Sequence, residues 1–466
     1  MVKITPLGGV GEIGLNCFVL ETEKAAIAID AGLMFPDEHM PGIDIVIPDF
    51  TYLESIRDKI KALILTHGHE DHIGAAPFFL KNFDIPVYAT LFTMALLKAK
   101  LAEHNIGYFR HTIVDKGEKL EFDDFRIEFI SVVHSIVDCV GLAIETKDGI
   151  IVHSGDFKID SHASEITDLV TFSRYGNKGV MLFLGDSTNA EKEGYSLSET
   201  TVKAKLEDII LRRTGRVFIA VFASNIPRIR NIFELAQKYG LKVFLDGKSM
   251  VSNVGIAKEL GYLDFPKELI LEERDLERHP GSRTVILTTG TQGEPMSALT
   301  RISHNAHRLL KITEGDTIVL SSRYIPGNEK AIHGLVNRLL RLGGNVFYED
   351  ISEVHTSGHA KREELRLLLQ IVRPKYFMPV HGEQRHLVKH SELALELGIP
   401  RENILLIKDG DSLSFEKGLL VSRGEVPHGR VFVDGKGVGD VEEMVLRDRR
   451  RLSTEGVTIV LIVVDS

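Results

Sequence analysis

Three imidazoles and two carboxylates fall within one six-residue segment, a density of ligand groups that suits metal chemistry. The segment reads His67-Gly68-His69-Glu70-Asp71-His72. Neutral imidazole and carboxylate are groups that zinc and manganese bind. The segment follows an apolar run, Ala62–Leu65, and precedes a helical pattern, so we expect it at the carboxyl end of a strand. There, His67 and His69 can converge on one ion, while Asp71 and His72 point to a second.

The alternative to a metal site is a histidine-rich solvent loop, but such loops rarely combine this spacing with a strand–turn–helix context. The composition agrees with a nitrogen and oxygen site, because the chain has 19 histidines and only two cysteines, Cys17 and Cys139. That count excludes a disulfide framework and a cysteine-rich zinc module. A serine hydrolase is disfavoured because the motif Gly-x-Ser-x-Gly is absent.

A separate, glycine-rich segment, Gly9–Gly14, satisfies the pattern G-x-G-x-x-G of dinucleotide-binding loops. Such a loop requires a helix after the glycines. Here the next residues, Leu15–Leu20, are typical of a strand. We therefore predict a tight turn between two strands and no dinucleotide cofactor.

The histidine segment resembles the signature of the metallo-β-lactamase superfamily, which takes further ligands from the ends of later strands. This chain has candidates in the same order: His134 after Val133, Asp156 after a strand ending at Gly155, and His381 after Val380. Alone, His134 or Asp156 has a structural role as its less favoured alternative. The resemblance implies two divalent cations per chain, zinc or alternatively manganese, with one bound by His67, His69 and His134, the other by Asp71, His72 and His381, and Asp156 bridging both.

Two such ions would convert a bridging water into hydroxide near neutral pH and hold a phosphate. The protein then supplies ligands, Asp71 among them, and no nucleophilic side chain. His153, although close to Asp156, is interpreted as a strand residue. The fold implied by the resemblance is α/β, an αββα sandwich.

Further segments resemble the β-CASP branch of this superfamily, whose members cut nucleic acids, and within it the ribonuclease J family. They are Pro6–Gly14, Gly185–Asn189, Phe222–Asn225, Thr289–Glu294, His355–Ala360 and Pro379–Glu383. The resemblance implies a zinc-dependent ribonuclease with 5′-to-3′ exonuclease and endonuclease activity. It assigns Asp186 and His359 to catalysis, stabilising the scissile phosphate or protonating the leaving oxygen.

Candidate RNA-binding residues lie near the same motifs. We assign them as Ser224, Asn225, Arg228, Ser357, Gly358 and His359. Of these, Ser224, Asn225, Ser357 and His359 could hold a terminal phosphate, and Arg228 could line an RNA channel. For Ser224 and Asn225, a helix cap ahead of Ile226-Pro227 is an equally good interpretation, and any one arginine could belong to a solvated surface. A small-molecule thioesterase or lactonase of the same superfamily is the alternative function, disfavoured by the long insertion.

The elements that position these residues divide the chain into several parts. Short strands occupy residues 1–197, the first part of the metallo-β-lactamase domain. Helices alternate with apolar strands in 198–355, which indicates an inserted β-CASP domain with a parallel sheet. Residues 356–430 return to the first domain, with strands predicted at Tyr376–Val380 and Asn403–Lys408. Residues 431–456 are predicted as a linker that carries an arginine cluster, Arg447–Arg451.

Residues 457–466 form an apolar segment that we interpret as the first strand of a truncated C-terminal domain. By the resemblance, that domain supports a homodimer or homotetramer in the full-length protein, with other RNA-decay proteins as further partners. The net charge of −10 disfavours a nonspecific DNA coat but allows a local basic groove. The start of the chain has no signal-peptide pattern, and no apolar run reaches membrane-spanning length. We therefore expect a cytoplasmic protein.

Overall fold

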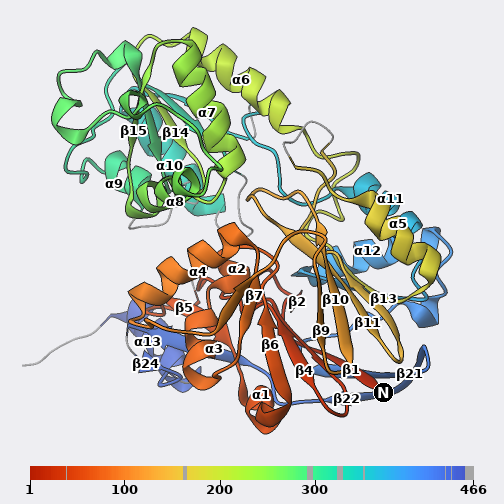
Figure 1. Cartoon of the computed structure of the whole chain (residues 1–466). Helices are drawn as coiled ribbons and strands as arrows, with labels where there is room; N and C mark the ends of the chain where they lie inside the picture. The colour runs from red at the N-terminus through yellow and green to blue at the C-terminus, as the bar shows by residue number, and fades with distance from the viewer. Residues whose placement is uncertain are drawn as a thin grey trace, which may run out of the picture.

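The computed structural model of the chain contains two β-sheets that face each other and a separate α/β unit above them (Figure 1). It describes residues 1–37, 39–160, 165–290, 297–322, 329–349, 352–435, 437–441 and 443–456. The segment 457–466, predicted to open a further domain, lies outside these residues.

The first of the facing sheets has the strand order β22-β21-β1-β3-β4-β6-β7-β8. Its strands are β1 Val2–Gly8, β3 Cys17–Glu21, β4 Ala26–Ile29, β6 Ile60–Ile64, β7 Val87–Ala89, β8 His111–Ile113, β21 Asp411–Glu416 and β22 Leu419–Glu425. Helices pack on its outer face: α1 Thr51–Ser55, α3 Ala76–Asn82 and α4 Leu91–Glu103. The short helix α2, Glu70–Ile73, follows β6 and carries the end of the histidine segment.

The second facing sheet has the order β19-β13-β12-β11-β10-β9. Its strands are β9 Lys119–Phe122, β10 Phe125–Ser131, β11 Val140–Thr146, β12 Gly149–His153, β13 Val180–Asp186 and β19 Tyr376–Val380. Its outer face carries α5 Leu169–Lys178, α11 Arg362–Val372 and α12 Gln384–Glu396. One buried cluster, including Phe18, Ile64 and Leu142, fills the space between the sheets. The predicted αββα sandwich is confirmed.

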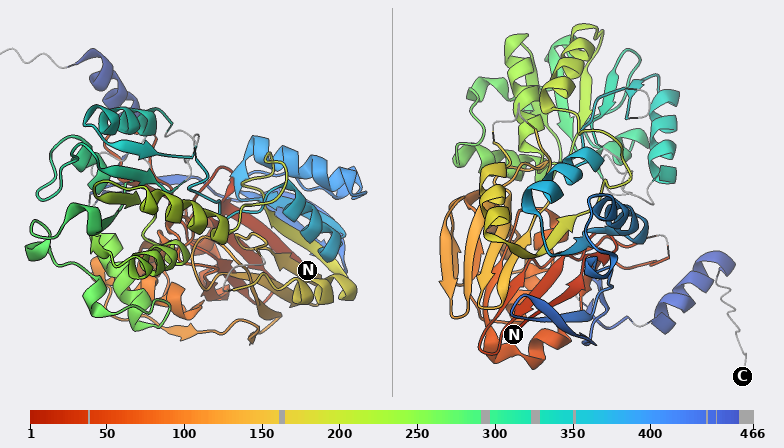
Figure 2. Two further views of the ribbon diagram at one scale, coloured as in Figure 1. Left: turned by 90° about the horizontal axis from the view of Figure 1, so that it is seen from above. Right: turned by 90° about the vertical axis from the view of Figure 1, so that its right-hand side faces the viewer.

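The inserted unit leaves the sandwich after β13 and returns to it before β19, and the two remain side by side in every view (Figure 2). Its five strands all run parallel, in the order β15-β16-β14-β17-β18. They are β14 Val217–Ala220, β15 Lys242–Leu245, β16 Thr284–Thr288, β17 Thr317–Leu320 and β18 Asn345–Phe347. One face packs on α6 Glu199–Leu211, α7 Ile226–Lys238 and α8 Lys248–Glu259, the other on α9 Ala298–Ser303 and α10 Glu329–Arg341.

The structure differs from the sequence interpretation after residue 400. Asn403–Lys408 is not a regular strand, because only an isolated bridge joins Ile404 to Phe377. Part of the predicted linker is ordered: β23 Arg430–Asp434 pairs with β5 Ile45–Pro48 and with β24 Gly437–Val438. The helix α13, Glu443–Glu455, follows. Among the described residues, no helix is long and apolar enough to cross a membrane.

Candidate metal centre

The histidines and aspartates singled out in the sequence meet at one edge of the two facing sheets. His67 and His69 follow β6, and Asp71 and His72 lie in α2. The other three follow the ends of β10, β12 and β19; they are His134, Asp156 and His381. Strands from both sheets thus bring side chains more than 300 residues apart in sequence to one place.

His67, His69 and His134 form the first cluster, with ligand atoms within 4.8 Å of one another. His69 Nδ1 lies 3.1 Å from His67 Nε2 and 3.2 Å from His134 Nε2. Burial lowers the pKa of His67 and of His134 well below the ordinary value, and lowers the pKa of His69 to about 4. Neutral imidazoles whose ring nitrogens converge in this way are suited to bind one cation.

Asp71, His72, Asp156 and His381 form the second cluster. One oxygen, Asp156 Oδ2, lies 3.3 Å from Nε2 of both His72 and His381. The same oxygen lies 3.7 Å from His67 Nε2 and 3.8 Å from His134 Nε2 in the first cluster. Asp156 therefore stands between the two clusters, where a bridging carboxylate would lie.

A further observation fits a cation at this place. His381 Nε2 is buried and makes no hydrogen bond, although burying a polar atom without a partner is costly. His381 also has a left-handed backbone, with φ of 53°. Strain of this kind persists only where surrounding contacts impose it. The donor set of imidazoles and carboxylates is the one that zinc and manganese take.

In two histidines of the second cluster, the ring nitrogen Nδ1 has its own hydrogen-bond acceptor. His72 Nδ1 lies 2.8 Å from Asp30 Oδ2, and His381 Nδ1 lies 2.9 Å from Asn16 Oδ1. Such partners fix the ring orientation and direct Nε2 toward the ion. Sequence reasoning missed Asp30 and Asn16 in this role. Asp30 gave one signal, since it ends a predicted strand, as the other carboxylates of the site do.

Asp186 and His359 form a hydrogen-bonded pair beside the second cluster. His359 Nδ1 lies 2.8 Å from Asp186 Oδ2 and 3.9 Å from Asp156 Oδ2. Burial alone would lower the pKa of His359, but the charge of Asp186 and its hydrogen bond raise that pKa to about 9. The imidazole keeps 18% of its surface exposed. The raised pKa favours the protonated imidazole, which remains partly accessible beside the second cluster.

The turn before His359 supports the cluster as well. The Gly358 carbonyl oxygen lies 2.8 Å from His134 Nδ1. A Cβ atom at Gly358 would stand 2.6 Å from the same ring, so only glycine fits without displacement. The Ser357 hydroxyl accepts hydrogen bonds from the Asn189 amide at 2.8 Å and from the His359 N–H at 3.2 Å. Gly358, which we assigned to RNA, thus contacts a candidate metal ligand.

The candidates near α7 have structural contacts. The Asn225 side chain caps α7 by accepting the Arg228 N–H at 3.0 Å. Arg228 is fully buried, and its guanidinium donates to both carboxylate oxygens of Glu199 at 2.7 and 2.8 Å. It also donates to Ser321 and to the Val354 carbonyl. Our assignment of Arg228 to RNA is therefore corrected, because the guanidinium is occupied and shielded from solvent.

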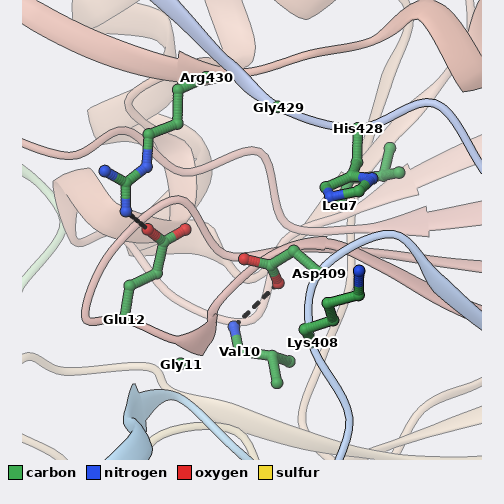
Figure 3. A pocket seen from close by; sticks show the side chains of 9 residues that line it. All are labelled: Leu7, Val10, Gly11, Glu12, Lys408, Asp409, His428, Gly429 and Arg430. Carbon is green, nitrogen blue, oxygen red and sulfur yellow. Dashed lines mark hydrogen bonds and ion pairs between the residues drawn. The ribbon is translucent and has the colours of Figure 1, made fainter.

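The glycine-rich segment contacts the backbone of His381 and of the two residues that follow it. The Gly9 carbonyl accepts the His381 N–H at 2.7 Å, and β2 (Val10–Gly11) pairs with β20 (Gly382–Glu383). Figure 3 shows the Val10 N–H, which donates to Asp409 at 3.0 Å. A cavity of about 230 Å³ opens here, and none of the seven candidate ligands lines it. The segment lies between two strands, as predicted, and supports a ligand.

Sequence profiles of three families match successive parts of the chain. They are the metallo-beta-lactamase superfamily over residues 10–199, the ribonuclease J beta-CASP domain over 214–339 and the Zn-dependent metallo-hydrolase RNA specificity domain over 346–404. The Ribonuclease J2 of Bacillus subtilis is 42% identical over 470 residues, covering all of this chain and 84% of the relative. The chain belongs to the ribonuclease J family.

Other members of the family show the same extent of similarity. The Ribonuclease J of Helicobacter pylori strain 26695 is 41% identical over 468 residues, and that of Thermus thermophilus is 42% identical over 471 residues. The chain spans 68% of the Helicobacter protein and 82% of the Thermus protein. A solved Enterococcus faecalis protein of unknown function shares the fold, with a TM-score of 0.63, 15% identity, and coverage of 90% of this chain and all of that one.

Proposed function

We propose that this chain hydrolyses RNA phosphodiesters with water activated by two divalent cations, most simply zinc, with manganese as the alternative. The observation that carries the proposal is the position of Asp156 Oδ2, within 3.8 Å of ring nitrogens from both clusters. His67, His69 and His134 would hold one ion. Asp71, His72 and His381 would hold the other, and Asp156 would join them.

When bound, the two ions supply a hydroxide near neutral pH and neutralise charge on the attacked phosphate. The chain's own residues prepare that chemistry. In the first cluster, burial lowers the pKa of each imidazole and favours the neutral form that offers a lone pair, and in the second cluster Asp30 and Asn16 hold two rings in place. His359, kept protonated by Asp186, is placed to donate a proton to the leaving oxygen or to stabilise the scissile phosphate.

RNA as the substrate is supported by family membership and by the match of residues 346–404 to an RNA specificity domain. We further propose both 5′-to-3′ exonuclease and endonuclease action. For the exonuclease, the Ser357 turn would bind a terminal monophosphate, since its hydroxyl and neighbouring N–H groups suit an anion. Ser224 and Asn225 stay secondary candidates, because Asn225 already caps α7.

The test is to give the chain zinc or manganese and RNAs that differ only at the 5′ end, bearing a monophosphate, a triphosphate or a hydroxyl. Products are resolved by size. We expect 5′-monophosphate RNA to be degraded faster than 5′-triphosphate RNA, because a triphosphate overfills a pocket built for one phosphate. Equal degradation of both RNAs contradicts a binding site for the 5′ monophosphate at the Ser357 turn. If no RNA is cleaved, the proposed hydrolysis of RNA is wrong.

A further inference from the structure

A partly buried polar contact joins the inserted domain to the sandwich, away from the two places where the chain passes between them. The Tyr262 hydroxyl donates a hydrogen bond to Asp138 Oδ2. Tyr262 follows α8 of the inserted domain, and Asp138 lies four residues after the candidate ligand His134. The contact therefore links the insertion to the loop that carries part of the first cluster.

Asp138 is fixed by the sandwich on its other sides. Its Oδ2 also accepts the Phe92 N–H at 3.2 Å, and its Oδ1 lies 3.0 Å from Lys116 Nζ. Lys116 in turn pairs with Glu165 at 2.8 Å, and Glu165 accepts the Asp138 N–H. Asp138 has a left-handed backbone, with φ of 64°. The carboxylate is thus an anchored acceptor whose position the sandwich sets.

The loop around Asp138 contacts the histidine segment. The Val132 N–H donates to the Cys139 carbonyl at 3.2 Å and closes the loop that holds His134. The Ile136 side chain lies 3.4 Å from the Cβ position of Gly68, between the candidate ligands His67 and His69. The loop that carries Asp138 therefore packs against the backbone of the histidine segment.

Tyr262 is held from both sides, by the sandwich and by its own domain. Its ring packs edge-on against Phe92 of α4, with centroids 5.3 Å apart. The Tyr262 carbonyl accepts a hydrogen bond from the Arg230 guanidinium at 2.8 Å, and Gly261, with φ of 80°, turns the chain out of α8. Tyr262 is therefore a rigid projection of the inserted domain onto the sandwich.

We propose that Tyr262 and Asp138 are a positioning pair that holds the inserted domain closed over the metal centre during RNA binding. Neither residue touches the reacting atoms; Tyr262 acts by fixing the inserted domain to Asp138, whose position the sandwich sets. The RNA part of this inference rests on the proposed function. The nearby Lys248–Glu103 ion pair also joins α8 to α4, but its side chains are 87% and 58% exposed, so it contributes little.

The test compares Tyr262→Phe with Tyr239→Phe. Tyr239 also donates its hydroxyl to a carboxylate, that of Glu207, but within the inserted domain. Hydrogen exchange is measured over residues 132–140 and 255–265. Losing a hydrogen bond to a charged acceptor should speed exchange about 10-fold. In Tyr262→Phe we expect faster exchange in both segments, although 132–140 lies in the other domain, and in Tyr239→Phe in neither.

Kinetics then connect the contact to RNA. We expect Tyr262→Phe to raise KM for RNA about 10-fold with little change in kcat. It should leave hydrolysis of the small phosphodiester bis(p-nitrophenyl) phosphate unchanged, since that substrate needs only the metal centre. Faster exchange confined to 255–265, or an unchanged KM for RNA, overturns the positioning role. If the wild-type chain cleaves no RNA, the proposed function fails, whereas the exchange experiment still tests the contact between domains.

Discussion

Polar residues follow strand ends both at the metal centre and in the inserted domain, but they differ in whether their side chains find hydrogen-bond partners within the protein. At the metal centre, imidazole nitrogens converge on a shared carboxylate, and one of them, His381 Nε2, has no hydrogen-bond partner. After β14, the corresponding polar groups have partners within the protein. The Asn225 side chain caps α7, and the Arg228 guanidinium forms a buried ion pair with Glu199. Polar side chains that converge and include a buried atom without a hydrogen-bond partner indicate a ligand site. Polar side chains whose partners lie within the protein indicate a structural role.

The largest expected effect on RNA turnover comes from removing the carboxylate that lies between the two clusters. Asp156→Asn keeps the size of the side chain but removes the charge that both ions would share. We expect turnover of RNA to fall on the order of 100-fold or more, with the fold retained. Steady-state cleavage and circular dichroism measure these two outcomes. An Asp156→Asn chain with wild-type turnover contradicts the assignment of Asp156.

The next effect concerns His359, which we place in catalysis and which, with Asp186, also lies within ligand distance of Asp156 and His381. His359→Ala should lower kcat roughly 100-fold, as expected for the loss of a proton donor, with RNA affinity little changed. Since the protonated form is the donor, wild-type turnover should fall as pH rises through the raised pKa of His359. Collapse of RNA binding with unchanged single-turnover cleavage would make His359 a binding residue.

A smaller effect is expected at Gly358, whose carbonyl holds His134. Gly358→Ala introduces a Cβ that meets the imidazole at 2.6 Å and displaces it. Zinc affinity should fall roughly 10-fold, in the range found when outer partners of a ligand are lost. Competition with a chromogenic chelator measures this affinity. Gly255→Ala in helix α8, where a Cβ meets nothing within 4 Å and the backbone is helical, serves as the control.

The smallest effect on RNA binding is expected at Arg228. Its replacement should lower the stability of the fold instead. Arg228→Met leaves Glu199 without its partner and should destabilise the inserted domain by about 3 kcal/mol, lowering Tm by roughly 6–12 °C. RNA affinity of the folded protein should not change. Arg212→Met, which breaks the exposed Arg212–Asp208 pair, is the control and should leave Tm unaltered. Weaker RNA binding at unchanged Tm would restore Arg228 as an RNA contact.

The apolar strands of the sequence predicted most of the sandwich, and the resemblance to the metallo-β-lactamase superfamily singled out the seven candidate ligands that the fold brings together. Sequence reasoning failed where a role depends on contacts distant in sequence. Arg228 appears as an exposed loop cation until the fold brings Glu199 against it. Asn403–Lys408 has the apolar pattern of a strand, yet only Ile404 and Leu405 meet Phe377. The contact between Tyr262 and Asp138 has no local signal at all.

The central claim, two cations joined by Asp156, is tested most directly by counting metal. The wild-type chain is stripped with a chelator, reconstituted with zinc and assayed by elemental mass spectrometry alongside RNA cleavage. We predict two zinc ions per chain, with turnover restored only when the second binds. Full turnover with one zinc ion per chain, or with none, would contradict the account.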